Sequence, residues 1–388
     1  MSEELSRRLF LQQSLCAALY ATVVPPTARL LADQSRTKLP LEIPAETLIK
    51  ELTKTIPSLL ARFNVPGLSI FVIRDSSLLW SKGFGVKNVA TNEAVTPATI
   101  FEAASLSKPV FAYAVLKLCE MGTLGLDTPL TEYLTEPFLP DDPRLKLITA
   151  RMVLSYSSGI PHQRKQGQPL TLLFEPGTKF HYSAIGYAYL QKVVEKVSEQ
   201  SLADFMRVNL LEPLDMTDSS FGWVNKYRKQ IAQGYDANGK PGQTLNERYR
   251  NFTAAEKAEM STQYPELKMP SASAGLYTTP ADFAKFMINI LSPARPDKFR
   301  LTEGAVRQML KPEIKAGPNT SWGLGWGIQH TAAGDAFWQR GNHEVFQNLA
   351  IGFRKHGIGV VIMTNSGNGL RLCDELVPKA IGTRNPDF

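Results

Sequence analysis

The segment FEAASLSKPV, residues 101–110, places a serine, a lysine and a proline at spacings that are able to do chemistry. Ser105 and Lys108 are three residues apart, so on a helix the hydroxyl and the amine share one face. Apolar neighbours such as Phe101, Val110 and Phe111 would bury the amine, and burial favours the neutral form, which can act as a base or proton relay. The segment therefore predicts acyl transfer with Ser105 as nucleophile and Lys108 as its proton partner.

Pro109 locates the start of the helix that carries these residues. Proline is tolerated in the first helical turn, where the amide hydrogens have no internal partners, and is costly deeper in a helix. If the apolar run PVFAYAVLKLCEMG is helical, its first turn must begin near Ser105 or Leu106. The backbone N–H of Ser105 then lies free at the positive end of the helix dipole, which predicts one half of an oxyanion hole.

The spacing alone does not single out Ser105. Ser35 and Lys38 have the same spacing, but they lie in a polar linker in which nothing would bury the lysine. A strand-rich segment precedes Ser105 and an apolar helix follows it, which is the context that such a motif requires.

Hydrophobic periodicity predicts the elements around this motif. Residues 45–62 have helical spacing, and GLSIFVIRDSSLLWSKGFG, residues 67–85, has the pattern of two strands joined at a turn over residues 74–77. Residues 184–197 give the clearest helical pattern of a long middle section. Strand patterns return near the C-terminus, at residues 322–328, 336–339, 346–353 and 358–365.

Together these patterns indicate an α/β (α+β) fold. Strands at both ends of the chain predict one antiparallel sheet flanked by terminal helices, with a mostly helical lobe inserted between them. The expected boundaries are a linker at 33–44, a sheet domain formed by 45–107 and 269–388, and a helical lobe at 108–268.

The composition describes a globular chain and disfavours several classes of function. Of 388 residues, 43% are hydrophobic and 20% are charged. The net charge of +7 and the pI of about 9.1 come from scattered lysines and arginines, which is typical of a solvated basic surface and not of nucleic-acid binding. Five histidines and three cysteines without a CxxC or HExxH pattern give no support to a metal site, and we expect no metal and no cofactor.

The N-terminus resembles a twin-arginine export signal. SRRLFLQ, residues 6–12, is followed by an apolar run at 15–24 that Pro25 and Pro26 stop at once. The run is too short to span a bilayer, and the prolines disfavour an amphipathic helix. We expect residues 1–32 to be removed, with Ala28 as the alternative cleavage point to Ala32, giving a periplasmic or secreted protein without a stable membrane anchor.

Two cysteines remain after such cleavage, Cys119 and Cys373. The sequence leaves their pairing open. Because Cys119 lies in an apolar helical segment, a buried free thiol is the expected state.

Seven phrases of the chain resemble a known family: VPGLSIFVI, FEAASLSK, ARMVLSYSSGIP, FEPGTKFHYSAIGYAYL, LLEPLDMTDSSF, SAGLYTTPADFAKF and WGLGWGI. They resemble the serine β-lactamase and penicillin-binding-protein superfamily, in the branch that holds class C β-lactamases, D-alanyl-D-alanine carboxypeptidases, D-aminopeptidases and β-lactamase-like esterases. The resemblance extends from Val65 to Asn365. It implies that Ser105 attacks a carbonyl of a small-molecule or short-peptide acyl substrate, that Lys108 and Tyr182 exchange the protons, and that water or another acceptor releases the acyl group.

Tyr182 stands in HYSA, where this family usually carries Tyr-x-Asn. A phenol beside an ammonium group has a lowered pKa and can serve as base and then acid. Ala184 replaces the asparagine that the resemblance implies would bind a substrate amide, and a methyl group cannot donate that hydrogen bond. We therefore expect simple esters to be better substrates than β-lactams.

The third family motif, Lys-Thr-Gly or His-x-Gly, also departs from the usual pattern. Its best register is Gln339, Arg340 and Gly341, because a register that begins at His343 lacks the glycine. The resemblance then implies that the N–H of Asn342 is the second oxyanion donor, a contribution of about 3 kcal/mol in such sites. Arg340 is predicted either to bind a substrate carboxylate or to be an arginine at a sheet edge.

His162 and residues 163–168 follow the SSGIP phrase and are predicted to form a solvated loop, with the rim of the cleft as the alternative. We assign no role to the loop at residues 238–243.

The sequence as a whole predicts a secreted serine hydrolase that acts on an ester or amide. The alternatives are a class C-like β-lactamase, a D,D-carboxypeptidase or a D-aminopeptidase. A non-catalytic binding protein ranks lowest, because Ser105, Lys108 and Tyr182 are all retained.

Overall fold

The computed structural model describes residues 43–134, 138, 142–163, 169–243, 245–255, 257, 270–293 and 297–381. The predicted export signal and all but the last two residues of the predicted linker lie outside the described residues.

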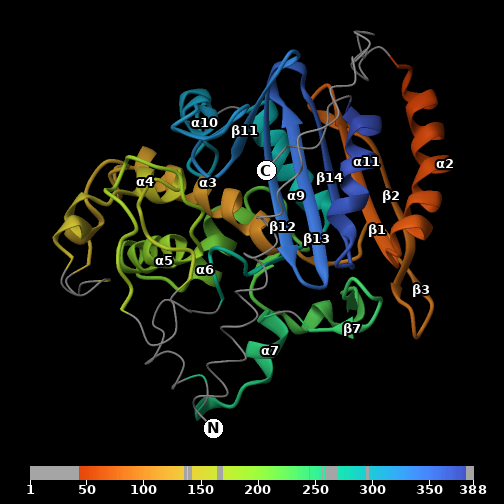
Figure 1. Cartoon of the computed structure of the whole chain (residues 1–388), viewed down its shortest axis with the longest axis horizontal. Helices are drawn as coiled ribbons and strands as arrows, with labels where there is room; N and C mark the ends of the chain where they lie inside the picture. Colours follow the sequence, from red (N-terminus) through yellow and green to blue (C-terminus); the bar gives the residue numbers. More distant parts are fainter. Residues whose placement is uncertain are drawn as a thin grey trace, which may run out of the picture.

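A nine-stranded sheet in the order β3-β2-β1-β14-β13-β12-β11-β10-β9 organises the fold. Neighbouring strands of this sheet pair antiparallel, and N-terminal β1 lies beside C-terminal β14, with Leu68 opposite Thr364 (Figure 1). The strands are β1 (Gly67–Arg74), β2 (Ser77–Asn88), β3 (Glu93–Ala94), β9 (Ile314–Gly317), β10 (Thr320–Trp322), β11 (Gly327–Thr331), β12 (Gly334–His343), β13 (Phe346–Phe353) and β14 (Ile358–Thr364). The predicted sheet, assembled from both ends of the chain, is confirmed.

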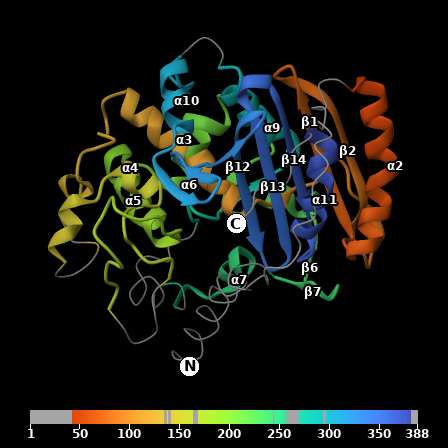
Figure 2. The ribbon, with the colours of Figure 1, turned by 45° about the horizontal axis from the view of Figure 1, so that its top comes forward.

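The central strands are buried because helices cover both faces of the sheet. All seven residues of β14 (IGVVIMT) are buried, an apolar run typical of a strand covered on both sides. Helices α2 (Ala45–Phe63) and α11 (Gly369–Ile381) lie on one face and α9 (Pro280–Leu291) on the other (Figures 1 and 2). Leu48, Leu52 and Ile56 form part of the buried stripe of α2, at helical spacing.

The regular elements of the chain between β4 (Phe101–Glu102) and β8 (Leu276–Thr278) are mostly helices, and this part lies beside the sheet (Figure 2). It contains α3 (Ser107–Glu120), α4 (Ala150–Leu154), α5 (Ala184–Ser198), α6 (Leu202–Met206), α7 (Leu245–Asn251) and the short strands β5 (Ser220–Phe221), β6 (Gly234–Tyr235) and β7 (Pro241–Gly242). A small sheet, β4-β8-β5, joins this region to the segments on either side of it. Helix α10 (Glu303–Leu310) follows α9.

One predicted strand is wrong. The stretch at residues 322–328 is divided between β10 and β11, with Gly325 in the left-handed region at a φ of 90°. A Cβ at this glycine would lie 2.5 Å from the Cβ of Ala112 in α3. The chain therefore bends where it comes closest to α3, and a continuous strand cannot form.

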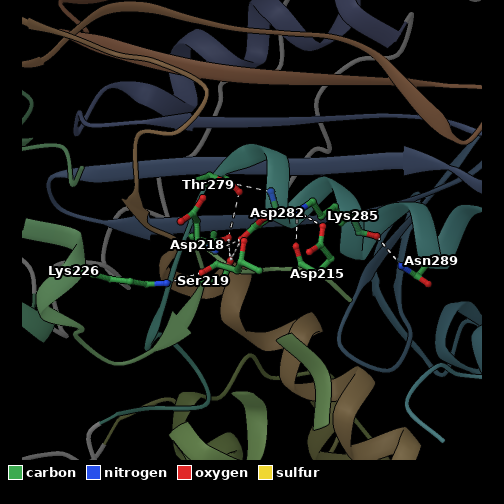
Figure 3. A network of polar contacts seen from close by, with 10 residues as sticks. Asp215, Asp218, Ser219, Lys226, Thr279, Asp282, Lys285 and Asn289 are labelled. Atoms are coloured by element: carbon green, nitrogen blue, oxygen red, sulfur yellow. Dashed lines mark hydrogen bonds and ion pairs between the residues drawn. The ribbon is translucent and has the colours of Figure 1, made fainter. Parts of the chain in front are cut away.

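A buried polar network ties α9 to the segment before β5 (Figure 3). The Thr279 hydroxyl caps α9 by accepting from the Asp282 N–H at 3.1 Å. The Asp282 carboxylate accepts from the Asp218 N–H at 2.8 Å and from the Ser219 hydroxyl at 2.9 Å, and Lys285 donates to it at 3.1 Å. Burial raises the pKa of Asp282 despite these hydrogen bonds.

Both cysteines of the described chain are free. Cys373 is fully buried in α11, whereas Cys119 is half-buried, and burial raises the pKa of both thiols, to about 12 for Cys119. Among the described residues, no helix is both long and apolar enough to cross a membrane, and no cluster of three or more potential metal ligands occurs.

Candidate active site

Ser105 lies in a 3₁₀ turn, Ala104–Leu106, that leads directly into α3. Ala104, just before the serine, has a φ of 51°, a conformation that non-glycine residues rarely adopt. The Ser107 hydroxyl holds this turn, because it donates to the Ala104 carbonyl at 2.7 Å and accepts from the Leu276 N–H at 2.9 Å. Pro109 falls in the first turn of α3, as predicted.

The Lys108 amine is buried beside the nucleophile, with 2% of the residue exposed. It donates to the Ser105 hydroxyl at 3.1 Å and to the Ser273 carbonyl at 2.8 Å. It also lies 4.9 Å from the centre of the Tyr182 ring. None of the ion pairs found among the described residues involves Lys108, so no carboxylate neutralises a positive charge at this position.

Tyr182 is the third member of the cluster. Burial alone would raise the pKa of its phenol, but the positive Lys108 and hydrogen bonds with Lys108 and Ser105 outweigh burial and hold that pKa below its ordinary value of 10. The neighbouring Tyr156 and Tyr187 behave oppositely, because burial raises the pKa of each well above 10. Tyr182 is thus the tyrosine of this group that most readily becomes a phenolate.

The start of α5 fixes the position of Tyr182. Ser183 caps this helix: its hydroxyl accepts from the Gly186 N–H at 2.9 Å and donates to the Pro161 carbonyl at 2.9 Å. Tyr182 therefore sits one residue before the cap and is anchored to the SSGIP segment. The structure brings the three predicted catalytic residues together.

Strand β12 approaches the nucleophile from the other side. A Cβ at Gly341 would lie 2.2 Å from the Ala103 carbonyl oxygen, so only glycine permits this contact. His343 and Phe346 flank a two-residue turn, so the backbone N–H and C=O groups of these two residues face each other. Because the direction alternates along a strand, the N–H and C=O of Asn342, one residue earlier, face away from β13. Strand β11 pairs with β12 only as far as Trp338, so the Asn342 N–H projects from a free edge. This orientation is the one required of an oxyanion donor.

The side chains of Gln339, Arg340 and Asn342 contact other residues of the protein. The Gln339 amide is buried and donates to the Arg340 carbonyl at 2.8 Å. The Asn342 side chain accepts from Gln347 at 3.1 Å. Arg340 forms an ion pair at 3.2 Å with Asp374 of α11, on the opposite face of the sheet from Gly341. The structure does not bring Arg340 to Ser105, and its position fits the alternative prediction of an arginine paired within the protein.

His162 is placed differently from the prediction of a solvated loop. Its Nδ1 accepts from the Ala184 N–H at 3.2 Å, and its ring centre lies 5.6 Å from that of Tyr182. Gln163 is described, whereas residues 164–168 of the predicted loop lie outside the described residues. Position directly after the SSGIP phrase was the only sequence signal for this contact.

A second group was missed from the sequence. The Glu102 carboxyl is fully buried, accepts from the Tyr277 hydroxyl at 2.6 Å and has an oxygen 3.5 Å from Nδ1 of His343. Burial followed by the charge of Glu102 raises the pKa of Tyr277. These contacts link Glu102, which lies three residues before Ser105, to His343, which directly follows Asn342.

The family model described as Beta-lactamase matches residues 52–375, and the chain belongs to this family within the serine β-lactamase and penicillin-binding-protein superfamily. Members of this family are generally serine hydrolases.

Similar proteins extend the comparison. "Protein flp" of Staphylococcus aureus (strain N315) is 24% identical over 349 residues, covering 86% of this chain and 65% of that protein. The chain thus spans about two thirds of the length of this relative. D-alanine carboxypeptidase AmpC from Burkholderia cenocepacia has a TM-score of 0.71 at 19% identity, and EstCE1, a hydrolase with promiscuous acyltransferase activity, has a TM-score of 0.72 at 18% identity; each match covers 87% of this chain and 99% of the other. At these identities the structural likeness establishes the shared fold.

Proposed function

We propose that this protein is a serine hydrolase that forms an acyl-enzyme through Ser105 on an ester or amide substrate. The contact that carries the proposal is the hydrogen bond from the buried Lys108 amine to the Ser105 hydroxyl, next to a tyrosine whose pKa is lowered. A purely structural lysine would gain more from a carboxylate partner, which Lys108 lacks among the described residues.

The arrangement supports a sequence of proton transfers. The Lys108 ammonium stabilises the Tyr182 phenolate. This phenolate takes the hydroxyl proton of Ser105 while the Ser105 oxygen bonds to the carbonyl carbon of the substrate. The N–H groups of Ser105 and Asn342 donate to the oxygen that becomes negative. The proton passes to the departing alcohol or amine as its bond to carbon breaks, and water then attacks the acyl-enzyme by the same steps in reverse.

Esters are the favoured substrates. Ala184 stands where the family resemblance implies an asparagine that binds the substrate's amide, and the buried, uncharged Gln339 stands where the third family motif usually carries a lysine or histidine. The fold likeness to EstCE1 is compatible with an esterase. The fold likeness to a D-alanine carboxypeptidase favours peptidase action as the second candidate.

The test compares hydrolysis of a chromogenic short-chain ester, a chromogenic cephalosporin and a peptide ending in D-Ala-D-Ala, with intact mass recorded in parallel. We expect ester turnover and an acyl adduct in the wild type and the absence of both in Ser105→Ala. Ser35→Ala, a change at the other Ser-x-x-Lys spacing, is the matched control and should behave as the wild type. Failure of all three substrates to acylate the wild type would contradict the proposal.

We also propose that the protein is exported to the periplasm or beyond through its twin-arginine segment. Replacing Arg7 and Arg8 by lysine should abolish export while leaving the enzyme active in the cytoplasmic fraction. Fractionation followed by the ester assay measures this, and unchanged export of the lysine variant would contradict the proposed route.

A further inference from the structure

His162 is held in one orientation beside the proposed nucleophile. Its Nδ1 accepts from the N–H of Ala184, the first residue of α5, at 3.2 Å. Its ring lies against Tyr182 at 5.6 Å between centres, with an interplanar angle of 48°. Tyr182 in turn contacts Lys108 and Ser105.

The hydrogen bond to Ala184 determines where the imidazole carries its proton. A nitrogen that accepts an N–H is unprotonated, so the neutral ring bears its hydrogen on Nε2. Burial, followed by the charges of Lys108 and His181, lowers the pKa of His162 to about 4. The titratable neighbour packed against the ring is Tyr182, whose own pKa is held below its ordinary value because Lys108 and Ser105 outweigh burial. At neutral pH His162 is therefore a neutral donor at Nε2.

Nothing within the described part of the protein uses this donor. Among the described residues, His162 contacts Ala184 through Nδ1 and Tyr182 through its ring, and its side chain is partly exposed. The adjacent Ala184 side chain is a methyl group, which carries no acceptor for this donor. A held, neutral imidazole ring thus borders the tyrosine that contacts the nucleophile.

We infer that the Nε2–H of His162 binds the acyl portion of the substrate, by donating to a neutral oxygen acceptor such as an amide or ketone carbonyl near the carbonyl that Ser105 attacks. This inference rests on the proposed function and deepens it. A neutral donor suits a neutral acceptor, because neither partner brings an uncompensated charge into a half-buried site. The predicted preference is for acyl groups that carry such a carbonyl over plain alkyl acyl groups.

The competing explanation is that His162 only caps α5. Two substitutions separate these roles. His162→Asn places an amide oxygen near the position of Nδ1, so it keeps the acceptor for Ala184 and removes the Nε2 donor. His162→Gln places an amide near Nε2 and weakens the cap.

The probes are two boronic acids of matched shape, acetamidomethylboronic acid and 3-methylbutylboronic acid, which differ in whether they carry the carbonyl acceptor. Each binds a nucleophilic serine by forming an oxygen–boron bond while the serine proton passes to the neighbouring base, and no group leaves. Dissociation constants and Tm are measured for the wild type, His162→Asn and His162→Gln, with Ser105→Ala as the control for binding at the nucleophile.

We expect the wild type to prefer the acetamido compound and His162→Asn to lose about tenfold of that preference while keeping its Tm, since a neutral hydrogen bond supplies a factor of this order. His162→Gln should keep most of the preference and lose Tm. An unchanged preference in His162→Asn, or an equal loss in both variants, would overturn the inference while leaving the nucleophile intact. Failure of both boronic acids to bind the wild type would instead overturn the proposed function and this inference with it.

Discussion

Two lysines sit near the starts of two helices of this protein and have opposite surroundings. Lys108 in α3 follows Ser105 by three residues, and Lys285 in α9 follows Asp282 by three residues. Lys285 is 37% exposed at its side chain and pairs with Asp215 at 3.0 Å and Asp282 at 3.1 Å (Figure 3). Lys108 is buried and pairs with a hydroxyl and a carbonyl.

The difference decides what each charge does. Burial would lower the pKa of Lys285, but its two carboxylates outweigh burial and raise it, so its charge is neutralised where it stands. The field of Lys108 instead reaches Tyr182 and His162, whose pKa values it lowers. An ion pair ties two segments together, whereas an unneutralised lysine among hydroxyl groups changes their acidity.

The first turns of α3 and α9 also differ in whether a side chain caps them. Thr279 caps α9 through its side chain, whereas Leu106 before α3 offers no side-chain cap. Outside its own helical turn, the Ser105 N–H has no backbone hydrogen-bond acceptor among the described residues. One helix start is closed by the protein, and the other keeps a donor for a substrate oxygen.

The largest expected effect separates the two lysines. Lys108→Met removes the charge but keeps an unbranched side chain, and should lower kcat/KM for the ester by about 10³-fold with a small change in Tm. Lys285→Met should leave kcat/KM within about twofold and destabilise the fold by about 1 kcal/mol, because solvent screens its half-exposed pair. Ester kinetics and thermal unfolding of both variants measure this; equal loss of activity in both would contradict the distinction.

The second effect concerns the base. Because the phenolate is the active form, kcat/KM should rise with pH up to the pKa of Tyr182, which lies below 10. Tyr182→Phe should lower kcat by about 10²-fold, and its kcat/KM should no longer show this rise with pH, which is the rising limb of the pH profile. Lys108→Met should move the limb to higher pH, since it removes the charge that lowers the pKa, and Lys285→Met should leave it in place. A limb that persists in Tyr182→Phe would assign the base elsewhere.

The sequence was sufficient to select the three residues that the structure brings together at the candidate site, and to predict most of the fold. Ser105 and Lys108 are marked by a three-residue spacing and a first-turn proline, whereas Tyr182 was predicted from the resemblance of HYSA to the family's Tyr-x-Asn motif. Strand patterns at both ends of the chain sufficed for the large sheet. These features depend on neighbours in the chain, which a single sequence displays.

What the sequence did not reveal depends on contacts between distant segments. The bend at Gly325 arises from its approach to α3, and the pairing of Arg340 with Asp374 depends on which face of β12 meets α11. The burial of Glu102 between Tyr277 and His343 joins three separate segments. Each side chain alone is compatible with several environments, so periodicity could not choose among them.

A smaller effect tests the surroundings of His162, where burial, followed by the charges of Lys108 and His181, lowers the pKa. The pKa of His162 is about 4 in the fold and near 6.5 in an unfolded chain, so the unfolded state binds more protons between these values. The stabilising contribution of neutral His162 is present above pH 6.5 and is lost as the pH falls toward 4. Relative to His162→Asn, the wild-type Tm should therefore fall by about 5 °C across this range. A constant difference in Tm would show that the imidazole titrates normally.

The smallest effect concerns the strained turn before the nucleophile. Ala104 has a φ of 51°, in the left-handed region where a Cβ costs about 1 kcal/mol. Ala104→Gly removes that strain but adds freedom to the unfolded chain, so the net gain should be a few tenths of a kcal/mol, or about 1 °C in Tm. Thr279, at the start of α9, has an ordinary extended conformation with a φ of −105°, and Thr279→Gly should lower Tm because it removes a capping hydroxyl.

Opposite signs for these two glycine substitutions would show that strain is confined to the helix start that carries Ser105. If Ala104→Gly also leaves kcat for the ester unchanged, the contacts of Ser107 with Ala104 and Leu276 suffice to place the nucleophile. A fall in both Tm and kcat would instead mean that the Ala104 methyl, which is fully buried, contributes more by packing than the turn loses by strain.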